Sequence, residues 1–320
     1  MKYVQLKNDK IPPIALGTWS WGNGINGGDA VFGNNLAEKD LKPVFDAAMK
    51  AGFNLWDTAT VYGMGASETI LGKFINENNN VIISTKFTPR GEQPETAVED
   101  MLSQSLSRLG VNHADIYWIH NPNDVERWTT KLIPLMKSGK IKHAGVSNHN
   151  LEEIKLAASI LEKDGLELSA VQNHYSLLYR SSEEAGIIDW CNQHNVLFFS
   201  YMVLEQGALT GSYSDKNPFK TGTRRGEAFN AEVLKKLNDL IDLMKTIGKK
   251  SGADPAQIAI AWAIAKGTVP IIGVTKPKHI DGAISAAEIV LTEQELKELE
   301  SAAKATGVEI KGAWEKSMHI

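Results

Sequence analysis

The feature of this 320-residue sequence that most constrains its fold is a regular alternation of short apolar runs with longer segments of helical period. The apolar runs recur at intervals of roughly thirty residues, a spacing typical of repeated βαβ crossovers. Eight of them are interpreted as strands, at residues 13–18, 53–57, 81–86, 114–120, 141–147, 168–173, 196–201 and 269–274. Eight such units favour a closed (β/α)8 TIM barrel of the α/β class, and an open doubly wound sheet is the alternative.

Segments outside this alternation complete the predicted architecture. Residues 3–14 predict a β-hairpin around Asn8-Asp9 that plugs the N-terminal end of the barrel. The polar, glycine-rich stretch 205–230 is too long for a simple connector, and long loops of this kind usually carry function. Residues 231–267 predict two helices separated near Asp254-Pro255, and the tail from 292 adds another. No linker divides the chain, so we expect a single barrel domain over residues 1–320.

Charge and composition exclude several classes of protein. The 34 Lys and Arg residues nearly balance the 38 Asp and Glu residues, and no block of like charge points to a nucleic-acid partner. The N-terminus lacks an apolar signal segment, and the longest apolar run, residues 196–204, is too short to span a bilayer. The single cysteine, Cys191, excludes an intrachain disulfide and is interpreted as a buried structural thiol. We expect a soluble, cytoplasmic protein without a metal site or membrane partner.

Two short motifs match known fingerprints without their structural context. Residues 22–27, "GNGING", fit GxGxxG, but that fingerprint must open a helix, and no helix is expected before about Glu38. A loop over a pocket is the better interpretation. Tyr3 and Lys7 have the YxxxK spacing of short-chain dehydrogenases, yet in a hairpin they would not lie one helical turn apart.

Polar side chains end three consecutive predicted strands. Asp57, Lys86 and His120 are each the last residue of a strand, and Tyr62 follows the first of these strands by five residues. Any one of them could simply meet solvent. In a (β/α)8 barrel, however, these strand ends share the rim where active sites lie, and buried Lys and Asp must pair.

This group of residues suits proton transfer to a carbonyl oxygen while hydride arrives at the carbonyl carbon. A phenol with a pKa of about 10 is a poor donor at neutral pH, but a neighbouring ammonium group would make it a stronger acid. Lys86 would have this effect on Tyr62, and Asp57 would hold Lys86 in place. His120 would orient the carbonyl group by a hydrogen bond.

Longer motifs carry a family resemblance that covers nearly the whole chain in order. The sequence resembles the aldo-keto reductases in "LGTWSWG", "DTATVYGMGASETILGKF", "ISTKF", "DIYWIHNP", "GVSNHN", "VQNHYSLLYR" and "SYMVLEQGALTG". The resemblance implies a (β/α)8 barrel that uses NAD(P)H without a Rossmann domain or a metal. It also implies a catalytic tetrad of Asp57, Tyr62, Lys86 and His120, the residues reached above from the strand ends.

The resemblance extends to the cofactor. It implies contacts from Gly17, Thr18, Trp19, Ser147, Asn148, Gln172, Tyr201, Leu204, Gln206, Gly207, Leu209, Gly211, Lys276, Lys278 and His279. Ser147, Asn148 and Gln172 would bind the nicotinamide carboxamide, although Ser147 and Asn148 could equally cap the following helix. Tyr201 would stack on the nicotinamide ring, and residues 203–211 would wrap the pyrophosphate. Met202 and Glu205 replace the family's commoner Ser-Pro and Gly, and we expect Glu205 to point outward, away from the phosphates.

The choice between NADP and NAD should depend on residues 273–280. Many relatives place a Lys and an Arg here for the 2′-phosphate, whereas this chain has Gly273 and His279 at those positions, with Lys276 and Lys278 nearby. The remaining basic character favours NADP(H), and NAD is the alternative. The family's adenine-contacting Glu-Asn pair is replaced by Gly282-Ala283.

Trp19, Trp21 and Trp118 are expected to line the substrate pocket, which suits an apolar or flat carbonyl compound, or the corresponding alcohol. The predicted function is a carbonyl reductase. The alternative is a cofactor-binding regulatory or redox-sensing protein resembling the potassium-channel β subunits of this family. Those subunits can retain the tetrad, but this chain has no extended segment before its hairpin where a regulatory arm could lie. Dehydratase or isomerase chemistry on the same fold is a third alternative.

Overall fold

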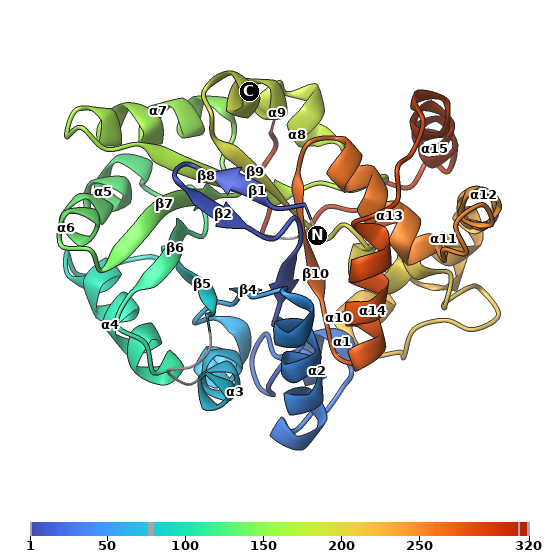
Figure 1. Cartoon of the computed structure of the whole chain (residues 1–320), viewed down its shortest axis with the longest axis horizontal. Coiled ribbons are helices and arrows are strands. Elements are labelled where there is room, and N and C mark those ends of the chain that lie inside the picture. The colour runs from blue at the N-terminus through green and yellow to red at the C-terminus, as the bar shows by residue number, and fades with distance from the viewer. Residues whose placement is uncertain (1, 76–79, 313, 319–320) are drawn as a thin grey trace.

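The computed structural model describes residues 2–75, 80–312 and 314–318. Eight parallel strands close into a barrel in the order β10-β3-β4-β5-β6-β7-β8-β9, with helices around it (Figure 1). The strands are β3 (Ala15–Gly17), β4 (Leu55–Asp57), β5 (Ile82–Phe87), β6 (Ala114–Ile119), β7 (Ile141–Ser147), β8 (Leu168–His174), β9 (Leu197–Tyr201) and β10 (Val269–Gly273). Because β10 pairs with β3, the predicted barrel is confirmed and the open sheet is excluded.

The predicted hairpin is present and plugs one end of the barrel. Strands β1 (Val4–Leu6) and β2 (Asp9–Ile11) pair antiparallel around a turn at Lys7-Asn8, one residue earlier than predicted. Leu6 and Ile11 are buried in a cluster with residues from inside the barrel. Figure 1 shows the hairpin lying across the barrel end that faces the viewer. The opposite end, to which the carboxyl ends of the strands point, is therefore the open one.

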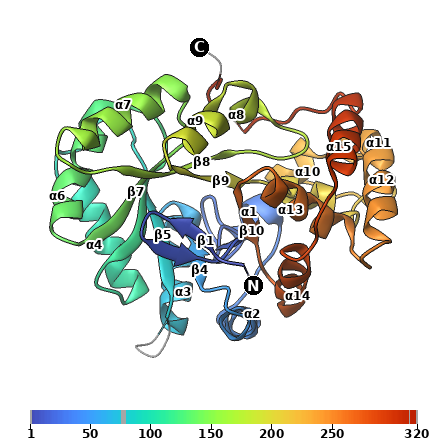
Figure 2. The same cartoon turned by 45° about the horizontal axis from the view of Figure 1, so that its top comes forward.

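The helices cover the outside of the barrel and, with two 3-10 turns, form its rim. They are α1 (Gly28–Phe32), α2 (Glu38–Ala51), η1 (Tyr62–Gly65), α3 (Ala66–Phe74), α4 (Ala97–Leu109), α5 (Val125–Thr130), α6 (Leu132–Lys137), α7 (Leu151–Glu162), α8 (Ser181–Glu184), α9 (Ile187–Gln193), η2 (Glu205–Thr210), α10 (Arg224–Ala228), α11 (Ala231–Lys236), α12 (Asn238–Gly248), α13 (Pro255–Ala265), α14 (Pro277–Ala286) and α15 (Glu293–Ala305). Helices α11, α12 and α15 gather on one flank (Figure 2). None of the described helices combines the length and apolar character of a membrane span.

Several predicted boundaries were wrong by a short distance. Residues 231–267 form three helices rather than two, because the chain breaks near Leu237 as well as before Pro255. The short helix α1 begins directly after "GNGING", where no helix was expected before about Glu38. It still gives no dinucleotide fingerprint, since the sheet is a closed barrel. Lys7 of the YxxxK match lies in the hairpin turn and pairs with Glu167.

Candidate active site

The open end of the barrel holds a cavity of about 1330 Å³. Its floor and walls are formed by the loops that follow the barrel strands and by the ends of six strands, β3, β4, β7, β8, β9 and β10. Pockets for drug-sized ligands are usually about 300–1,000 Å³, so this cavity has room for a larger ligand or for two ligands together. Asp57, Tyr62 and His120 line it, and Lys86 lies buried directly behind them.

Lys86 and Asp57 form a buried ion pair at the bottom of the cavity. Asp57 is the last residue of β4 and Lys86 the last but one of β5, so neighbouring strands bring them together. Lys86 Nζ donates to Asp57 Oδ2 at 2.5 Å and to the Thr58 carbonyl oxygen at 2.8 Å. Burial acts to lower the pKa of Lys86, but Asp57 and Tyr62 outweigh it, and the pKa is raised. Lys86 is therefore an ammonium ion at neutral pH.

Tyr62 lies over this ammonium group. Lys86 Nζ is 5.1 Å from the centroid of the Tyr62 ring. Burial raises the pKa of Tyr62, and Lys86 opposes this by lowering it. The effect of Lys86 has the predicted direction, but burial has the larger effect on the pKa, so the pKa of Tyr62 stays above its ordinary value of 10.0. Tyr62 is consequently protonated at neutral pH and able to donate.

His120 faces Tyr62 from the residue just beyond β6. The two rings lie 6.2 Å apart and nearly perpendicular, and His120 Nδ1 is 2.9 Å from Thr88 Oγ1. Burial lowers the pKa of His120 to about 3, with further contributions from Lys86 and Arg90. The imidazole is therefore neutral, which suits a hydrogen-bonding role rather than that of a cation.

Trp118 lies beneath the tetrad and not in the pocket wall, so its predicted role was wrong. It is fully buried and its Nε1–H donates to Ser84 Oγ at 2.7 Å. Ser84 in turn donates to Asp57 Oδ1 at 2.6 Å. Gly145 stands opposite Trp118 in the sheet, and a Cβ there would come within 2.3 Å of the indole. The Trp118 ring therefore lies below the cavity and holds the Asp57 carboxylate through Ser84, a link that was not predicted from the sequence.

Of the two other predicted pocket tryptophans, only Trp19 lines the cavity. Trp19 stacks on Tyr62, with ring centroids 5.9 Å apart. Trp21 is fully buried, donates from Nε1 to the Val274 carbonyl oxygen and packs against Trp56, so its predicted role was wrong. Its side chain points into the apolar layer between barrel and helices. Trp314, from the C-terminal tail, instead packs edge-on against Trp19 and lines the cavity.

Most residues predicted to contact the cofactor line one continuous cavity. They are Gly17, Trp19, Ser147, Asn148, Gln172, Tyr201, Leu204, Gln206, Gly207, Lys276, Lys278 and His279. Thr18, Leu209 and Gly211 do not line it: Thr18 donates to the Asp57 carbonyl oxygen, Leu209 lies in the apolar core and Gly211 faces Pro255. Asn150, rather than Ser147 or Asn148, caps helix α7.

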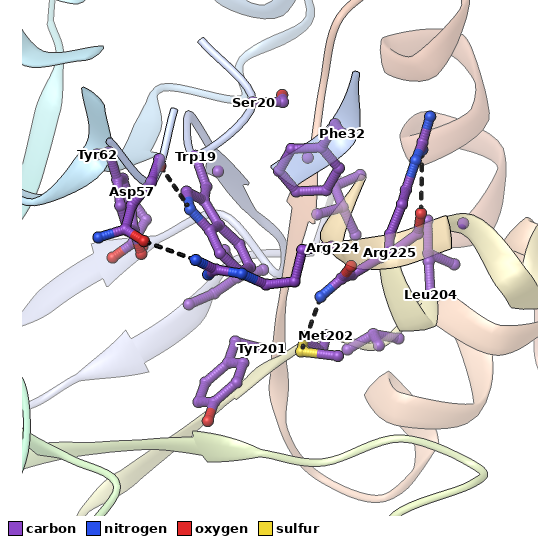
Figure 3. Close-up of a pocket in the computed structure, with 18 of the residues that line it drawn as sticks. Trp19, Ser20, Phe32, Asp57, Tyr62, Tyr201, Met202, Leu204, Arg224 and Arg225 are labelled. Atoms are coloured by element: carbon purple, nitrogen blue, oxygen red, sulfur yellow. Dashed lines mark hydrogen bonds between the residues drawn. The ribbon is translucent and has the colours of Figure 1, made fainter. Parts of the chain in front are cut away.

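The part of the cavity that these residues line, here called the cofactor groove, has features that a phosphorylated dinucleotide requires. In the described part of the chain, the N–H donor Arg225 Nε and the acceptor Gln206 Oε1 are shielded from solvent without a hydrogen-bond partner, and both side chains line the groove. Arg225 is labelled in Figure 3. Lys276 and Lys278 line the same groove. His279 is less suited to bind phosphate, because burial and the two lysines lower its pKa and its Nδ1 accepts the Thr275 N–H. These residues fit NADP without a charge on His279.

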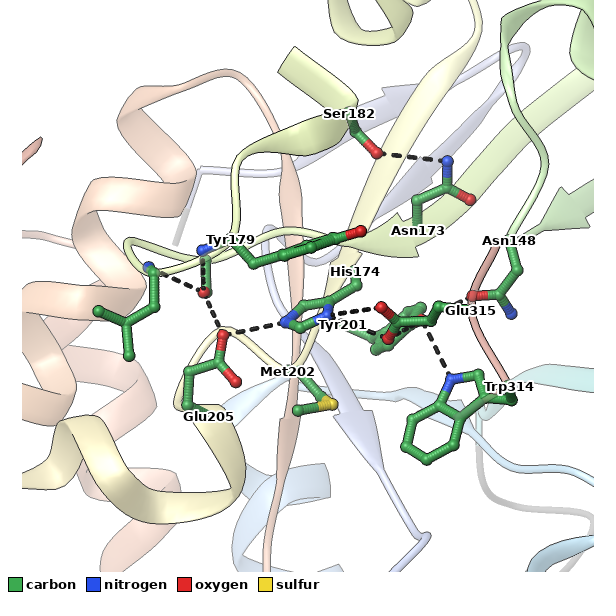
Figure 4. Close-up of polar contacts among 12 residues, drawn as sticks. Asn148, Asn173, His174, Tyr179, Ser182, Tyr201, Met202, Glu205, Trp314 and Glu315 are labelled. Carbon is green, nitrogen blue, oxygen red and sulfur yellow. Dashed lines mark hydrogen bonds and ion pairs between the residues drawn. The ribbon is translucent and has the colours of Figure 1, made fainter. Parts of the chain in front are cut away.

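Glu205 points inward, contrary to prediction. It is fully buried, and one of its carboxylate oxygens lies 2.9 Å from His174 Nε2 and accepts from Ser176 Oγ (Figure 4). Its backbone has φ of 47°, in the left-handed region that suits the glycine of the family pattern. The ion pair with His174 offsets the strain of this conformation.

His174 joins Glu205 to the C-terminal tail. Its Nδ1 is 3.0 Å from Glu315 Oε1, so two carboxylates flank one buried imidazole (Figure 4). Burial acts to lower the pKa of His174, but the two glutamates outweigh it and raise the pKa to about 9. The Tyr201 ring stacks on His174 at 5.5 Å, and its hydroxyl lies 2.6 Å from Asn148 Oδ1 and 2.9 Å from Glu315 Oε1. The tail thus contacts the residue predicted to stack on nicotinamide.

Cys191 has the structural role predicted for it. The thiol is buried in α9, and burial raises its pKa to about 12. A thiol with such a pKa is not a nucleophile at neutral pH.

The model of the Aldo/keto reductase family matches residues 13–304. The chain belongs to this family of NAD(P)H-dependent oxidoreductases.

Sequence relatives agree with this assignment, and solved structures share the fold. The chain is 31% identical to the chloroplastic pyridoxal reductase of Arabidopsis thaliana, over 92% of this chain and 84% of that protein. It is 28% identical to the aldo-keto reductase yakc [NADP(+)] of Schizosaccharomyces pombe, over 93% and 90%. In fold it is similar to the glycerol dehydrogenase AKR11B4 of Gluconobacter oxydans (TM-score 0.80, 24% identity, 98% and 99% coverage). It is also similar to an aldo-keto reductase of Klebsiella pneumoniae in complex with NADPH (TM-score 0.71, 24% identity, 92% coverage of each chain).

Proposed function

We propose that this protein transfers hydride between NADP(H) and the carbonyl carbon of an aldehyde or ketone, or catalyses the reverse oxidation of an alcohol. The observation that carries the proposal is a charged Lys86 buried between Asp57 and Tyr62, with a neutral His120 facing the same space. The name of the fission-yeast relative and the NADPH complex of the structural neighbour support the choice of NADP(H).

The residues would divide the reaction as follows. Bound NADPH supplies the hydride. Tyr62 donates its proton to the carbonyl oxygen, and Lys86 stabilises the phenolate that remains. Asp57 holds Lys86 charged and in place. Neutral His120 donates a hydrogen bond that orients the carbonyl group. General acid catalysis of this kind contributes roughly 10²–10⁴ in rate.

The chain's own groups would hold the cofactor along the groove. Tyr201 offers an aromatic face for the nicotinamide ring, and Ser147, Asn148 and Gln172 offer polar side chains for its carboxamide. Arg225 carries an unpartnered N–H donor, Nε, suited to the phosphates, and Lys276 and Lys278 supply charge for a 2′-phosphate. The last pair favours NADP over NAD.

The test is Tyr62→Phe, assayed by NADPH oxidation with a panel of aldehydes and ketones. We expect turnover to fall by about 10²–10⁴-fold because the acid is lost. NADPH binding, followed by cofactor fluorescence, should persist. Undiminished turnover would contradict the acid assignment. If the wild-type protein binds NADPH tightly but reduces none of the carbonyl compounds, the regulatory alternative is favoured.

A further inference from the structure

The cavity carries more positive charge than its cofactor groove needs. Among the described residues that line it, the cations are Arg90, Arg224, Arg225, Lys276, Lys278 and Lys316, and the carboxylates are Asp57 and Asp254. Both carboxylates are engaged, Asp57 with Lys86 and Asp254 as the N-cap of α13. The excess of cations over free carboxylates makes the cavity attractive to anions.

Two consecutive arginines at the start of α10 serve different parts of this cavity. The Arg225 guanidinium carbon lies 4.7 Å from the Phe219 ring and 5.4 Å from the Tyr213 ring, and Nη1 donates to the Gln206 carbonyl oxygen. Arg225 therefore belongs to the loop around the cofactor groove. Arg224 extends in another direction, across the cavity toward Trp19 and Tyr62 (Figure 3).

Two tryptophans, Trp314 and Trp19, connect Arg224 to Tyr62. The Arg224 guanidinium carbon lies 5.9 Å from the Trp314 ring, which packs against Trp19, and Trp19 stacks on Tyr62. Arg224 Nη2 donates to Asn26 Oδ1 at 2.8 Å, and this hydrogen bond holds the Arg224 side chain on the Trp19 side of the cavity. No ion pair of Arg224 is found in the part of the chain that the structure describes. A guanidinium group has five N–H donors, so most of its donors remain available to a ligand.

Two other cations border the same space. Arg90 is close enough to His120 to contribute to the low pKa of that imidazole. Lys316 follows Trp314 by two residues and also lines the cavity. Both side chains are exposed at the rim, and neither has an ion pair among the described residues. The mouth over the tetrad is thus aromatic on one side and cationic around its edge.

We propose that the carbonyl substrate carries an anionic group, a carboxylate or a phosphate, which Arg224 binds while the carbonyl oxygen lies between Tyr62 and His120. Arg90 and Lys316 add to the field that attracts it. The inference rests on the proposed reductase function, and it narrows the substrate from any flat carbonyl compound to an anionic one. Arg suits this task because its planar fork matches carboxylate and phosphate oxygens.

The experiment compares aldehydes that differ in charge and little in shape. The kcat/KM values of 4-carboxybenzaldehyde, 4-formylphenyl phosphate and the neutral methyl 4-formylbenzoate are measured with NADPH for the wild-type protein and Arg224→Met. We expect the wild-type protein to prefer an anionic aldehyde by at least about tenfold, the scale of one charge-assisted hydrogen bond. The preference should weaken with added salt and fall about tenfold in Arg224→Met. The more strongly preferred of the two anions identifies the group that is bound.

Two further variants separate a binding role from a structural one. Arg224→Lys should restore part of the preference, because it keeps the charge and loses the fork. Lys245→Met removes the same charge from exposed α12, outside the cavity, and should leave the ratio of the kcat/KM values unchanged. Equal kcat/KM for charged and neutral aldehydes in the wild-type protein would overturn the inference while leaving the reductase function intact. An Arg224→Met variant that loses all three activities in proportion would also overturn it, by showing a structural role. Failure of the wild-type protein to reduce any of the aldehydes would count against the reductase function itself.

Discussion

Two buried charge clusters lie at the open end of this barrel, and they differ in what surrounds the cation. Lys86 has one carboxylate, Asp57, and its remaining side faces Tyr62. His174 has a carboxylate on each ring nitrogen, and the rings of Tyr179 and Tyr201 stack on it. The first cluster leaves positive charge directed at a reactive group, whereas the second encloses its cation completely. A buried cation with a free side suits chemistry, and one with carboxylates on both sides suits attachment of segments.

The clusters also differ in the distance along the chain that they join. Asp57 and Lys86 lie on neighbouring strands of the barrel. His174 at the end of β8 contacts Glu205 in the 3-10 turn η2 and also Glu315, which lies 141 residues after His174 in the chain. The second cluster therefore depends on loop and tail positions that strand pairing does not set.

The largest expected effect separates the clusters by activity. Lys86→Met should lower kcat by about 10²–10⁴-fold, because the phenolate of Tyr62 loses its stabilising charge. It should also lower the free energy of unfolding by about 3–5 kcal/mol, since Asp57 is left buried and unpaired. The double variant Asp57→Asn/Lys86→Met should regain much of that stability but none of the activity. Recovery of kcat in the double variant would show that Lys86 only neutralises Asp57. Urea unfolding and steady-state assays measure both quantities.

The next effect concerns the enclosed cluster. His174→Gln should lower the free energy of unfolding by about 3–5 kcal/mol, because two carboxylates then face each other without a cation. The dissociation constant for NADPH should rise several-fold, since Glu205 and Tyr201 lose the group that positions them. The matched control is His174→Gln/Glu205→Gln/Glu315→Gln, which has no buried charge and should recover part of the stability. If the free energy of unfolding of His174→Gln falls by less than about 1 kcal/mol, other contacts hold the C-terminal tail.

The smallest effect is a difference in pH dependence. The pKa of His174 rises from an ordinary 6.5 to about 9 in the folded protein. A raised folded pKa gives stability that is fully present below about pH 6.5 and is lost as the pH rises through about 9. The stability difference between wild type and His174→Gln should therefore shrink between these values in urea titrations.

The Lys86 cluster provides the contrast over the same pH range. The pKa of Lys86 is raised above its ordinary value of 10.5, so this cation stays charged throughout. The difference in free energy of unfolding between the wild-type protein and Asp57→Asn/Lys86→Met should then stay constant over this pH range. A parallel decline in both comparisons would mean that a group outside the two clusters controls the pH dependence.

The comparison also explains how much could be predicted from the sequence. Strand periodicity and the barrel rim were enough to bring Asp57, Tyr62, Lys86 and His120 together, because parallel strands place their carboxyl ends side by side. The roles of Ser84 and Trp118 were available in the same pattern, since Ser84 stands opposite Asp57 in the sheet. They were missed because an inward tryptophan near the rim was interpreted as part of the pocket wall, whereas Trp118 lies buried below the cavity.

The enclosed cluster gave a weaker signal. Glu205 replaces a glycine of the family pattern, and the sequence alone did not show that its left-handed backbone would direct the side chain inward. Trp314, Glu315 and Lys316 lie in a tail without helical or strand period, so only the tertiary structure places them at the cavity. Arg224 was hidden in a long loop for the same reason.

The contact between Trp118 and Gly145 has a consequence for how this site can change. The indole occupies the space that any side chain at position 145 would need, and the same indole is hydrogen-bonded, through Ser84, to the carboxylate that holds Lys86. A methyl group added at position 145 would therefore displace the indole of Trp118. The displacement would pass through Ser84, Asp57 and Lys86 to the proton donor Tyr62 without any contact with the substrate. Variation in substrate preference is consequently free to accumulate in the loops above the cavity, while the layer below it must be inherited as a set.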